Sequence, residues 1–350
     1  MIATALILAP SRGRGGGIER YVDTIEWALG THGVRCFRVN LTGPGIAGNA
    51  RILRECRRHF GPDDGPPDRL IVAHRSLVPA AALLSRRWRS CRMYVVCHGI
   101  EVWAARPRMR SAVEDWLMRR SHIRVVAVSN FTSGALFSEC QATILPPGLS
   151  PAWFATLVEA ANPEHHREPG IHLMTAFRLV DFRDKGLPQI LDAIARLGRA
   201  DVRMTVCGSG QQPEDLRRLI GEYPWCTLRN GLSDEELALQ FASADLFVLA
   251  TRMRRGQGAS GEGFGMVLLE AQIAGTPVVG PAFGGSHEAF LRQITGDAPV
   301  DETAQALSTV LDRLLKDPAT LEQMGRQAAQ WSRQCFAPDT YASRVVSALL

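Results

Sequence analysis

The sequence predicts an α/β protein in which two Rossmann-like domains, each built on a parallel sheet, face one cleft. Short apolar runs alternate with amphipathic helical patterns in both halves of the chain. Glycine-rich loops follow several of these runs, at the strand ends where such sheets bind ligands. Pro146-Pro147-Gly148 interrupts the alternation and marks a linker.

In the first half, an apolar strand over 2–8 leads into the glycine-rich loop 11–17 and a helix over 18–30. Ser129 suits the N-cap of a later helix, because its hydroxyl can accept from the backbone of the first turn. The other expected strands of this half are 34–39, 70–73, 93–97, 125–128 and 143–145, and the other expected helices are 78–88 and 110–119.

The second half repeats the alternation without repeating the sequence. Ser233 and Glu236 have the spacing of a capping box, which predicts a helix over 233–242. The expected strands are 171–177, 202–207, 226–228, 246–250 and 278–279, and the other expected helices are 187–197, 213–220, 302–315, 319–332 and 338–350. We therefore expect one domain over residues 1–148 and a second over residues 149–336.

Composition is that of a folded soluble protein, with 46% apolar and 21% charged residues. The eight cysteines form no CxxC pair, which favours reduced thiols and a cytoplasmic location. The opening residues MIATALILAP resemble a signal peptide but lack a basic flank, so we interpret them as a buried strand. No apolar run approaches the roughly 20 residues of a membrane span.

Positive charge is concentrated in the N-terminal half. Residues 1–150 carry 21 arginines and 11 acids, whereas the remainder carries 19 basic and 24 acidic residues. Arginine clusters with interleaved tryptophans in this half predict peripheral contact with anionic lipid at the inner face of the membrane, and a solvated surface shaped by codon bias is the alternative. No nucleic-acid-binding module is recognisable.

The stretch Ala259–Val279 carries the strongest chemical pattern. Glu262 and Glu270 flank a glycine-rich turn and the start of an apolar helix. Free backbone N–H groups and the positive helix end favour an anion there, while the carboxylates suit hydroxyl groups. Together they indicate a sugar-nucleotide site. Structural roles, with Glu262 complementing the helix end and Glu270 on the surface, are the alternative.

Arg178 and Lys185 bracket the loop after an expected strand, so both could reach one diphosphate. His98 with Gly99 ends another strand, where the imidazole could donate to a ligand oxygen and the glycine permits close approach. A solvated loop and a structural histidine are the alternatives for these two motifs.

Other chemistries have weaker support. Ile18 stands where a dinucleotide fingerprint needs its third glycine, so NAD binding is not favoured. Asp63-Asp64 and His165-His166 lack companions at metal-ligand spacing. There is no Walker loop and no GxSxG motif.

These motifs resemble the GT4 glycosyltransferases, retaining enzymes of the GT-B fold. Gly261–Glu270 matches the E-x7-E signature of that family, and Arg178 with Lys185 matches its Arg…Lys-Gly pair across a slightly longer loop. The longer string His98–Trp103 is similar to that of bacterial exopolysaccharide and antibiotic enzymes. Further matching segments are Gly16–Arg20, Gly208–Gly210, Ala244–Phe247 and Gly284–Glu288.

The resemblance implies a role for each matching residue. Arg178 and Lys185 would neutralise the departing diphosphate, Glu262 would orient the donor sugar, and His98 would contact the sugar. Glu270 would accept the ribose hydroxyls, and Leu232 would touch the base. The remaining donor-binding positions, which act through backbone or close approach, would be Gly16, Gly17, Gly208, Gly263, Phe264, Gly265 and Met266. The C-terminal helix, about 337–350, would pack on the N-terminal domain.

The resemblance implies transfer of a hexose from a nucleotide-diphosphate sugar to an acceptor hydroxyl, with no metal and no bound cofactor. UDP- and GDP-sugars both remain open as donors. The acceptor is a glycan, a lipid-linked sugar or a secondary metabolite. A nucleotide-sugar epimerase of GT-B type and a non-catalytic sugar-nucleotide-binding partner are the alternatives.

Overall fold

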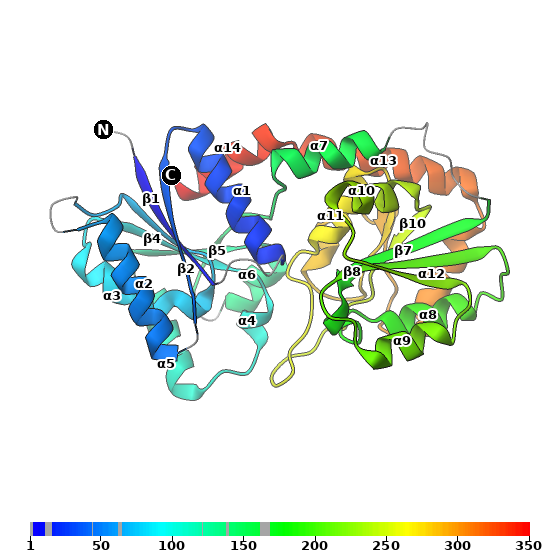
Figure 1. The fold of residues 1–350 in the computed structure, drawn as a ribbon, viewed down its shortest axis with the longest axis horizontal. Helices are drawn as coiled ribbons and strands as arrows, with labels where there is room; N and C mark the ends of the chain where they lie inside the picture. The colour runs from blue at the N-terminus through cyan, green and yellow to red at the C-terminus, as the bar shows by residue number, and fades with distance from the viewer. Residues whose placement is uncertain are drawn as a thin grey trace. The chain divides into compact units, whose positions relative to one another are not determined.

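The computed structural model describes residues 3–10, 16–43, 45–61, 65–120, 122–137, 140–161 and 169–350 (Figure 1). The chain divides into two compact units, each with its own sheet and helices. The first unit comprises Met1–Ser150, Arg255–Ala259 and Pro338–Leu350, and the second comprises Pro151–Arg254 and Ser260–Ala337. Residues 11–15 of the expected glycine loop, Asp63-Asp64 and His165-His166 lie outside the described residues.

The first unit is built on a parallel six-stranded sheet with the order β2-β1-β3-β4-β5-β6. The apolar opening of the chain forms β1, which lies between two other strands and is almost wholly buried. Burial on both faces explains why this strand is continuously apolar. The strands are β1 (Thr4–Ala9), β2 (Arg35–Asn40), β3 (Arg69–Val72), β4 (Arg92–Cys97), β5 (Ile123–Ala127) and β6 (Ala142–Ile144).

Helices connect these strands, as the alternation predicts. The helices are α1 (Gly17–Thr31), α2 (Gly45–His59), α3 (Val78–Arg87), α4 (Ile100–Trp103), α5 (Arg108–Met118), α6 (Asn130–Leu136) and α14 (Pro338–Leu349), and a short 3-10 turn is η1 (Arg75–Leu77). Ser129 caps α6 as expected, since its side chain accepts from the Thr132 N–H. Helix α2 was not predicted, because its buried apolar residues, such as Ile52 and Cys56, are few and four arginines interrupt the pattern.

The second unit is also built on a parallel six-stranded sheet, with the order β12-β11-β10-β7-β8-β9. The strands are β7 (Ile171–Arg178), β8 (Val202–Ser209), β9 (Cys226–Asn230), β10 (Leu246–Val248), β11 (Val278–Val279) and β12 (Gly296–Asp297). The two-residue strand β12 was not predicted, because it consists of Gly296 and Asp297, two residue types that are depleted in strands. Two parallel sheets with alternating helices confirm the predicted fold class.

The helices of the second unit are α7 (Pro151–Ala160), α8 (Leu187–Ala195), α9 (Glu214–Gly221), α10 (Asp234–Ser243), α11 (Met266–Ile273), α12 (Ala304–Leu315) and α13 (Pro318–Phe336), with 3-10 turns η2 (Leu179–Asp181) and η3 (Gly285–Glu288). The capping box of Ser233 and Glu236 at α10 is confirmed. Helix α7, which packs on α10 and α11, was not predicted, because it directly follows the proline-rich linker.

Two segments join the first unit from far along the chain. Helix α14 lies along α1 (Figure 1), and its Tyr341 packs its ring against the backbone at Gly148. The segment 255–259, which was expected to stay in the second domain, pairs instead with the end of α4. There the Gly256 N–H donates to the Trp103 carbonyl at 3.0 Å.

No disulfide bond joins any of the eight cysteines. Burial raises the pKa of the Cys207 thiol to about 12, so this thiol stays protonated at neutral pH. Among the described residues, no helix is both long enough and apolar enough to cross a bilayer.

Gly148→Ala is expected to destabilise the first unit. A Cβ at this position would lie 2.5 Å from the fully buried Tyr341 ring, which has no room to move aside. We expect a loss of about 1–3 kcal/mol in the free energy of unfolding, the usual cost of overpacking a filled core. Urea unfolding followed by circular dichroism measures it.

Gly134→Ala is the matched control. Gly134 lies exposed within α6, and a Cβ there would meet nothing within 4 Å. Alanine is the better helix former, so we expect unchanged or slightly higher stability. Equal stability of the two variants would contradict the packing of Tyr341 on Gly148.

Candidate functional site

The candidate site residues of the second unit lie at the carboxyl edge of its sheet. Arg178 ends β7, Gly208 lies near the end of the neighbouring strand β8, and Leu232 follows β9. Thr251 and Glu262 lie in the long loop between β10 and α11. Because all six strands are parallel, these segments leave the sheet at one edge, where open α/β sheets bind ligands.

A compact cluster forms around Glu262. Its Oε1 accepts from the Lys185 ammonium at 2.6 Å and from the Thr251 hydroxyl at 2.8 Å. The Lys185 and Glu262 side chains keep 25% and 14% of their surface exposed, so the pair is sheltered but reachable from solvent. Thr251 is buried and holds the carboxylate from the protein side. Sequence reasoning did not identify Thr251.

The backbone fixes this cluster by close approach of two loops. Gly186 is left-handed, and a Cβ there would lie 2.1 Å from the Ala250 carbonyl oxygen. The Arg252 N–H donates to the Asp184 carbonyl at 2.9 Å, which ties the two loops together. Lys185 and Thr251 therefore reach Glu262 from neighbouring, rigidly held segments. Glycine is required beside the lysine for this reason.

The loop that carries Glu262 ends in the N-terminus of α11. Gly265 is the left-handed N-cap residue and has no side chain to occupy the helix end. The Gly285 N–H donates to the Glu262 carbonyl at 2.8 Å, and Gly284 lies directly against that carbonyl. Ser286 borders Gly265, and its buried hydroxyl has no hydrogen-bond partner among the described residues.

The helix end can hold an anion, since its first N–H groups have no partners within the helix. Gly263 and Gly265 keep Cβ atoms away from the approach, whereas Phe264 is buried and packs against Phe336, with the ring centroids 6.0 Å apart and the rings tilted. Phe264 therefore anchors the loop through its side chain, and only its backbone is available to a ligand. Met266 opens the helix.

Glu270 lies one turn inside α11 and is buried, with 3% of its surface exposed. Its Oε1 accepts from the Trp153 indole N–H at 3.0 Å. A surface position, the alternative considered above, is therefore wrong. Trp153 comes from α7, the helix that sequence reasoning did not find, and a tryptophan just after a proline–glycine linker gives no recognisable signal.

Arg178 differs from Lys185 in being open to solvent. Its side chain is 58% exposed and pairs with Asp181 at 2.7 Å, a link between surface residues that contributes little stability. The guanidinium is therefore available to a ligand. Gly208 is needed for packing, because a Cβ there would lie 2.4 Å from Leu179. Leu232 is half-buried.

His98 and Gly16 with Gly17 belong to the first unit. Gly16 is the N-cap of α1, with open space where a Cβ would be. The His98 Nε2 lies 2.8 Å from the Ala73 carbonyl oxygen, and its ring meets Tyr21 edge-on. Burial lowers the pKa of His98, and the Ala73 carbonyl can only accept. The neutral ring therefore carries its proton on Nε2 and presents Nδ1 as an acceptor.

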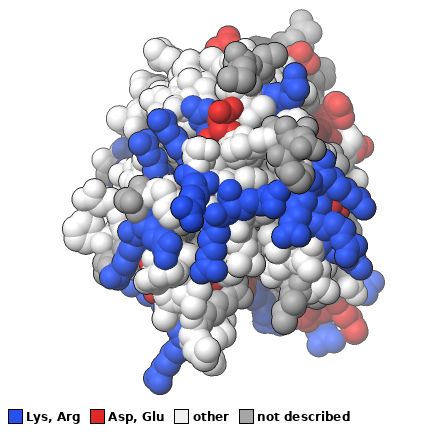
Figure 2. All heavy atoms as spheres, turned by 90° about the vertical axis from the view of Figure 1, so that its left-hand side faces the viewer, with Lys and Arg blue, Asp and Glu red and all other residues white. Residues whose placement is uncertain are grey.

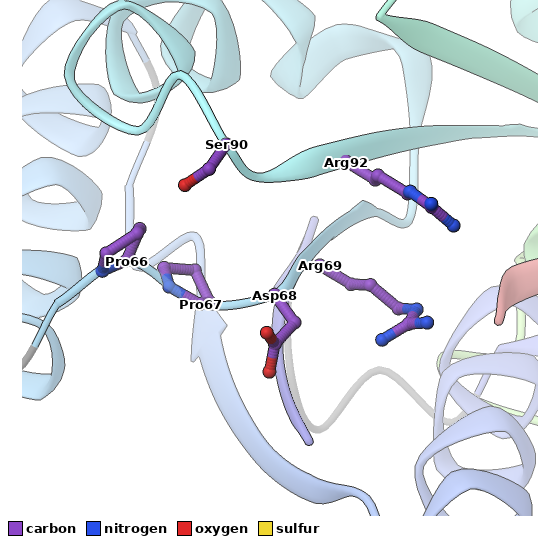
Figure 3. A pocket seen from close by; sticks show the side chains of 6 residues that line it. All are labelled: Pro66, Pro67, Asp68, Arg69, Ser90 and Arg92. Carbon is purple, nitrogen blue, oxygen red and sulfur yellow. The ribbon is translucent and has the colours of Figure 1, made fainter. Parts of the chain in front are cut away.

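A pocket of about 290 Å³ lies elsewhere, where β3 and β4 begin (Figure 3). Two of its polar side chains are already engaged within the protein. Asp68 accepts from the Thr4 N–H at 2.7 Å, which keeps the pKa of its carboxyl low, and Arg69 donates to the Leu350 carbonyl at 3.0 Å. The pocket is at the amino ends of these strands, away from the edge where parallel sheets bind ligands.

No cluster of three or more His, Cys, Asp or Glu side chains that could hold a metal occurs in the part of the chain that the structure describes.

Residues 174–331 match the family model described as glycosyl transferases group 1. A GDP-mannose-dependent alpha-(1-6)-phosphatidylinositol monomannoside mannosyltransferase of Mycolicibacterium smegmatis is 29% identical over 76% of this chain and 72% of its own. A D-inositol 3-phosphate glycosyltransferase of Pseudarthrobacter chlorophenolicus is 35% identical over 54% of this chain and 47% of its own, so that match spans about half of the relative.

Solved structures confirm the fold. Anabaena Alr3699/HepE in complex with UDP and glucose has a TM-score of 0.75 at 16% identity and covers 98% of both chains. Sucrose-phosphate synthase from Thermosynechococcus elongatus has a TM-score of 0.78 at 17% identity with the same coverage. These structures confirm the predicted GT-B architecture, and the family model and the sequence relatives confirm the predicted glycosyltransferase class.

The His98 ring is expected to stay neutral below pH 6.5, the ordinary pKa of histidine. The unfolded chain binds this proton more readily than the folded one. The neutral His98 ring therefore contributes to the free energy of unfolding above pH 6.5, and this contribution is lost as the pH falls through the lowered pKa. Nitrogen-15 NMR of the imidazoles should show a proton on Nε2 at pH 6.5, with His98→Gln used for assignment. A ring that titrates at or above 6.5 would contradict the burial.

Proposed function

We propose that this chain, which is a GT4-like glycosyltransferase with the GT-B fold, is a retaining enzyme. It transfers a hexose-type sugar from a nucleotide-diphosphate sugar to an acceptor hydroxyl. The observation that carries the proposal is the cluster of Lys185, Glu262 and Thr251 at the sheet edge, next to the glycine-lined N-terminus of α11.

The leaving diphosphate gains negative charge as the sugar departs. Lys185 and the exposed Arg178 supply two cations. The N–H groups of the preceding loop, Gly263–Gly265, and of Met266 at the start of α11 add the positive end of a helix. The backbone N–H groups are fixed before the reaction, whereas Lys185 and Arg178 reach the phosphate by exchanging their carboxylate partners. These positive groups can neutralise the diphosphate in the way that a metal ion would, and we propose that the reaction uses no metal.

The Lys185–Glu262 pair has a further consequence for donor binding. The ammonium is balanced by one carboxylate at 2.6 Å when no phosphate is present. A bound diphosphate carries more negative charge and attracts Lys185 away from exclusive contact with Glu262. Glu262 retains its hydrogen bond from Thr251 and can then accept from the hydroxyls of the donor sugar.

We propose different tasks for the two glutamates. Glu270 accepts from the ribose hydroxyls, and the Trp153 N–H bond sets the direction of its remaining lone pairs. Glu262 orients the sugar and is not the nucleophile. His98, with Nδ1 as an acceptor, contacts a sugar hydroxyl. Leu232 touches the base. Gly16-Gly17 approaches the phosphate. Gly208 permits the close packing of the neighbouring backbone and Leu179 beside the donor.

Retention follows from attack on the face that the diphosphate leaves. Departure of the diphosphate produces an oxocarbenium-like sugar, which the acceptor oxygen attacks from that same face. The leaving phosphate oxygen takes the acceptor proton, so no enzyme carboxylate is needed as nucleophile or base.

The names of the relatives leave the donor base open and favour one class of acceptor. GDP-mannose is the donor named for the mycobacterial relative, and UDP is bound in a similar structure, so both bases remain candidates here. Both named acceptors carry inositol and phosphate, one of them as a lipid. We therefore favour a lipid-linked or phosphorylated polyol acceptor, handled by a cytoplasmic enzyme at the inner face of the membrane. A glycan and a secondary metabolite are the alternatives within the same chemistry.

Lys185→Ala and Glu262→Ala are each expected to lower sugar transfer about 100-fold or more, the usual cost of removing a preorganised group from a developing charge. A thermal-shift panel of UDP-, GDP-, ADP- and TDP-sugars first identifies the donor. Release of nucleotide with an acceptor present then measures the rate. Lys185→Ala should also lose most of the thermal shift given by the donor.

Lys316→Ala is the control, because Lys316 is the other lysine of the chain and pairs with Asp312 on an exposed helix surface. It should transfer sugar at the wild-type rate. Near-full activity of Lys185→Ala would refute the assignment. Donor conversion without an acceptor would indicate an epimerase, and tight donor binding without turnover would indicate a binding protein.

Thr251→Val is expected to lower kcat about tenfold with a smaller change in KM, because Glu262 loses the bond that holds it while Lys185 turns to the phosphate. Thr251→Ser keeps the hydroxyl and should restore most of the rate. Both rates come from the same nucleotide-release assay. Equal loss in the two variants would show that packing, and not the hydroxyl, is what matters.

A further inference from the structure

Helix α5 presents an apolar stripe to solvent. Met109, Val113 and Trp116 recur at the spacing of one helix face, and 85%, 48% and 53% of their surfaces are exposed. Leu117, which lies beside the stripe, and Met118, on the opposite side, are buried. An amphipathic helix normally buries its larger apolar side chains, so an outward stripe with three of them marks a surface that contacts something.

Both acids of α5 are turned away from this stripe. Glu114 is 1% exposed and contacts Arg75 at 3.3 Å and Arg106 at 3.1 Å. Asp115 also pairs with Arg75. Arg75 and Arg106, from outside the helix, therefore neutralise the acids on its inner side, and the outer side is left apolar and cationic.

Arginines flank the stripe. Arg108, Arg119 and Arg120 are exposed at the two ends of α5, and the Arg120 guanidinium lies 3.8 Å from the centre of the Trp116 ring. Helix α3, which packs on α5, adds the exposed Arg86 and Arg87. Figure 2 shows Lys and Arg side chains forming a broad band on the side of the molecule turned toward the viewer, with acidic side chains mainly near its edges.

We propose that the outer face of α5 docks on an anionic lipid bilayer. The apolar stripe would lie among the headgroups and the upper acyl chains, and the flanking arginines would pair with lipid phosphates. A helix with an apolar face, flanking arginines and an aromatic at the boundary is what such an interface favours. A protein partner would need a complementary surface, whereas a bilayer accommodates a convex single helix.

The proposal deepens the proposed function, because a lipid-linked acceptor is met at such a surface. It does not depend on catalysis, however, since binding to vesicles is measured without donor or acceptor. Loss of membrane binding and loss of transfer can therefore be separated.

The test is flotation of the full chain with vesicles of phosphatidylcholine containing phosphatidylglycerol, compared with phosphatidylcholine alone. Wild type should float with the anionic vesicles, and less so at high salt. The triple variant Met109→Ser, Val113→Ser, Trp116→Ser should bind about tenfold or more weakly, since the buried apolar area is lost. Arg119→Ser with Arg120→Ser should reduce both the binding and its salt dependence.

A matched control removes three exposed apolar side chains from the second unit. Leu239, Ile294 and Val300 are 38%, 48% and 77% exposed, and their serine variants should float like wild type. All variants should keep the melting temperature and the thermal shift given by the donor, which shows that the fold and the donor site are intact.

Three outcomes would overturn the proposal. The first is a wild type that binds neither vesicle, and the second is an α5 triple variant that floats as well as wild type. The third is a wild-type dimer in sedimentation that the triple variant abolishes, which would make a second copy the occupant of this face. A blue shift of the tryptophan fluorescence on anionic vesicles, absent in Trp116→Phe, would independently support insertion.

Discussion

The contact between Lys185 and Glu262 is the interaction on which the second unit is organised. Its two partners are 77 residues apart in sequence, and each comes from a loop with little structure of its own. Two close backbone approaches bring them together. Gly186 lies against the Ala250 carbonyl, and Gly284 lies against the Glu262 carbonyl. A Cβ at Gly186 would lie 2.1 Å from the Ala250 carbonyl oxygen and would push the Lys185 loop away, whereas one at Gly284 would lie 3.1 Å from the Glu262 carbonyl oxygen and would disturb the loop that carries Glu262.

The parallel sheet explains why such distant segments meet. Every strand of a parallel sheet ends at the same edge, so motifs that follow different strands converge without direct sequence contact. The sheet alone places the site side chains at this edge but does not fix where each loop puts them. The finer positions depend on hydrogen bonds such as Thr251 to Glu262 and Trp153 to Glu270, which hold each carboxylate from behind.

These finer contacts also mark the limit of sequence reasoning here. The alternation of strands and helices, the capping box at Ser233 and the fold class were predictable, because each has a local pattern. Helix α2 was not, since arginines dilute its apolar stripe, and α7 was not, because a linker signal precedes it. Trp153 and Thr251 act through contacts 117 and 11 residues away along the chain, and no local pattern distinguishes them. The segment 255–259 left its expected domain through backbone pairing at Gly256, which side-chain patterns do not encode.

Neutralised charge performs a different task in each unit. In the second, the partner of Lys185 is a carboxylate that keeps part of its surface open, so an incoming anion can compete for the ammonium. In the first, Glu114 and Arg75 are both 1% exposed, and nothing from solvent can reach them. A sealed pair of this kind is expensive to break, because the remaining charge would stay buried with one partner fewer: Arg75 would keep Asp115, and Glu114 would keep Arg106. It therefore fixes the orientation of α5 permanently and determines which of its faces is left for solvent. The degree of burial thus distinguishes the two ion pairs. The partly exposed Lys185–Glu262 pair can respond to a ligand, whereas the buried Arg75–Glu114 pair determines which face of α5 is exposed.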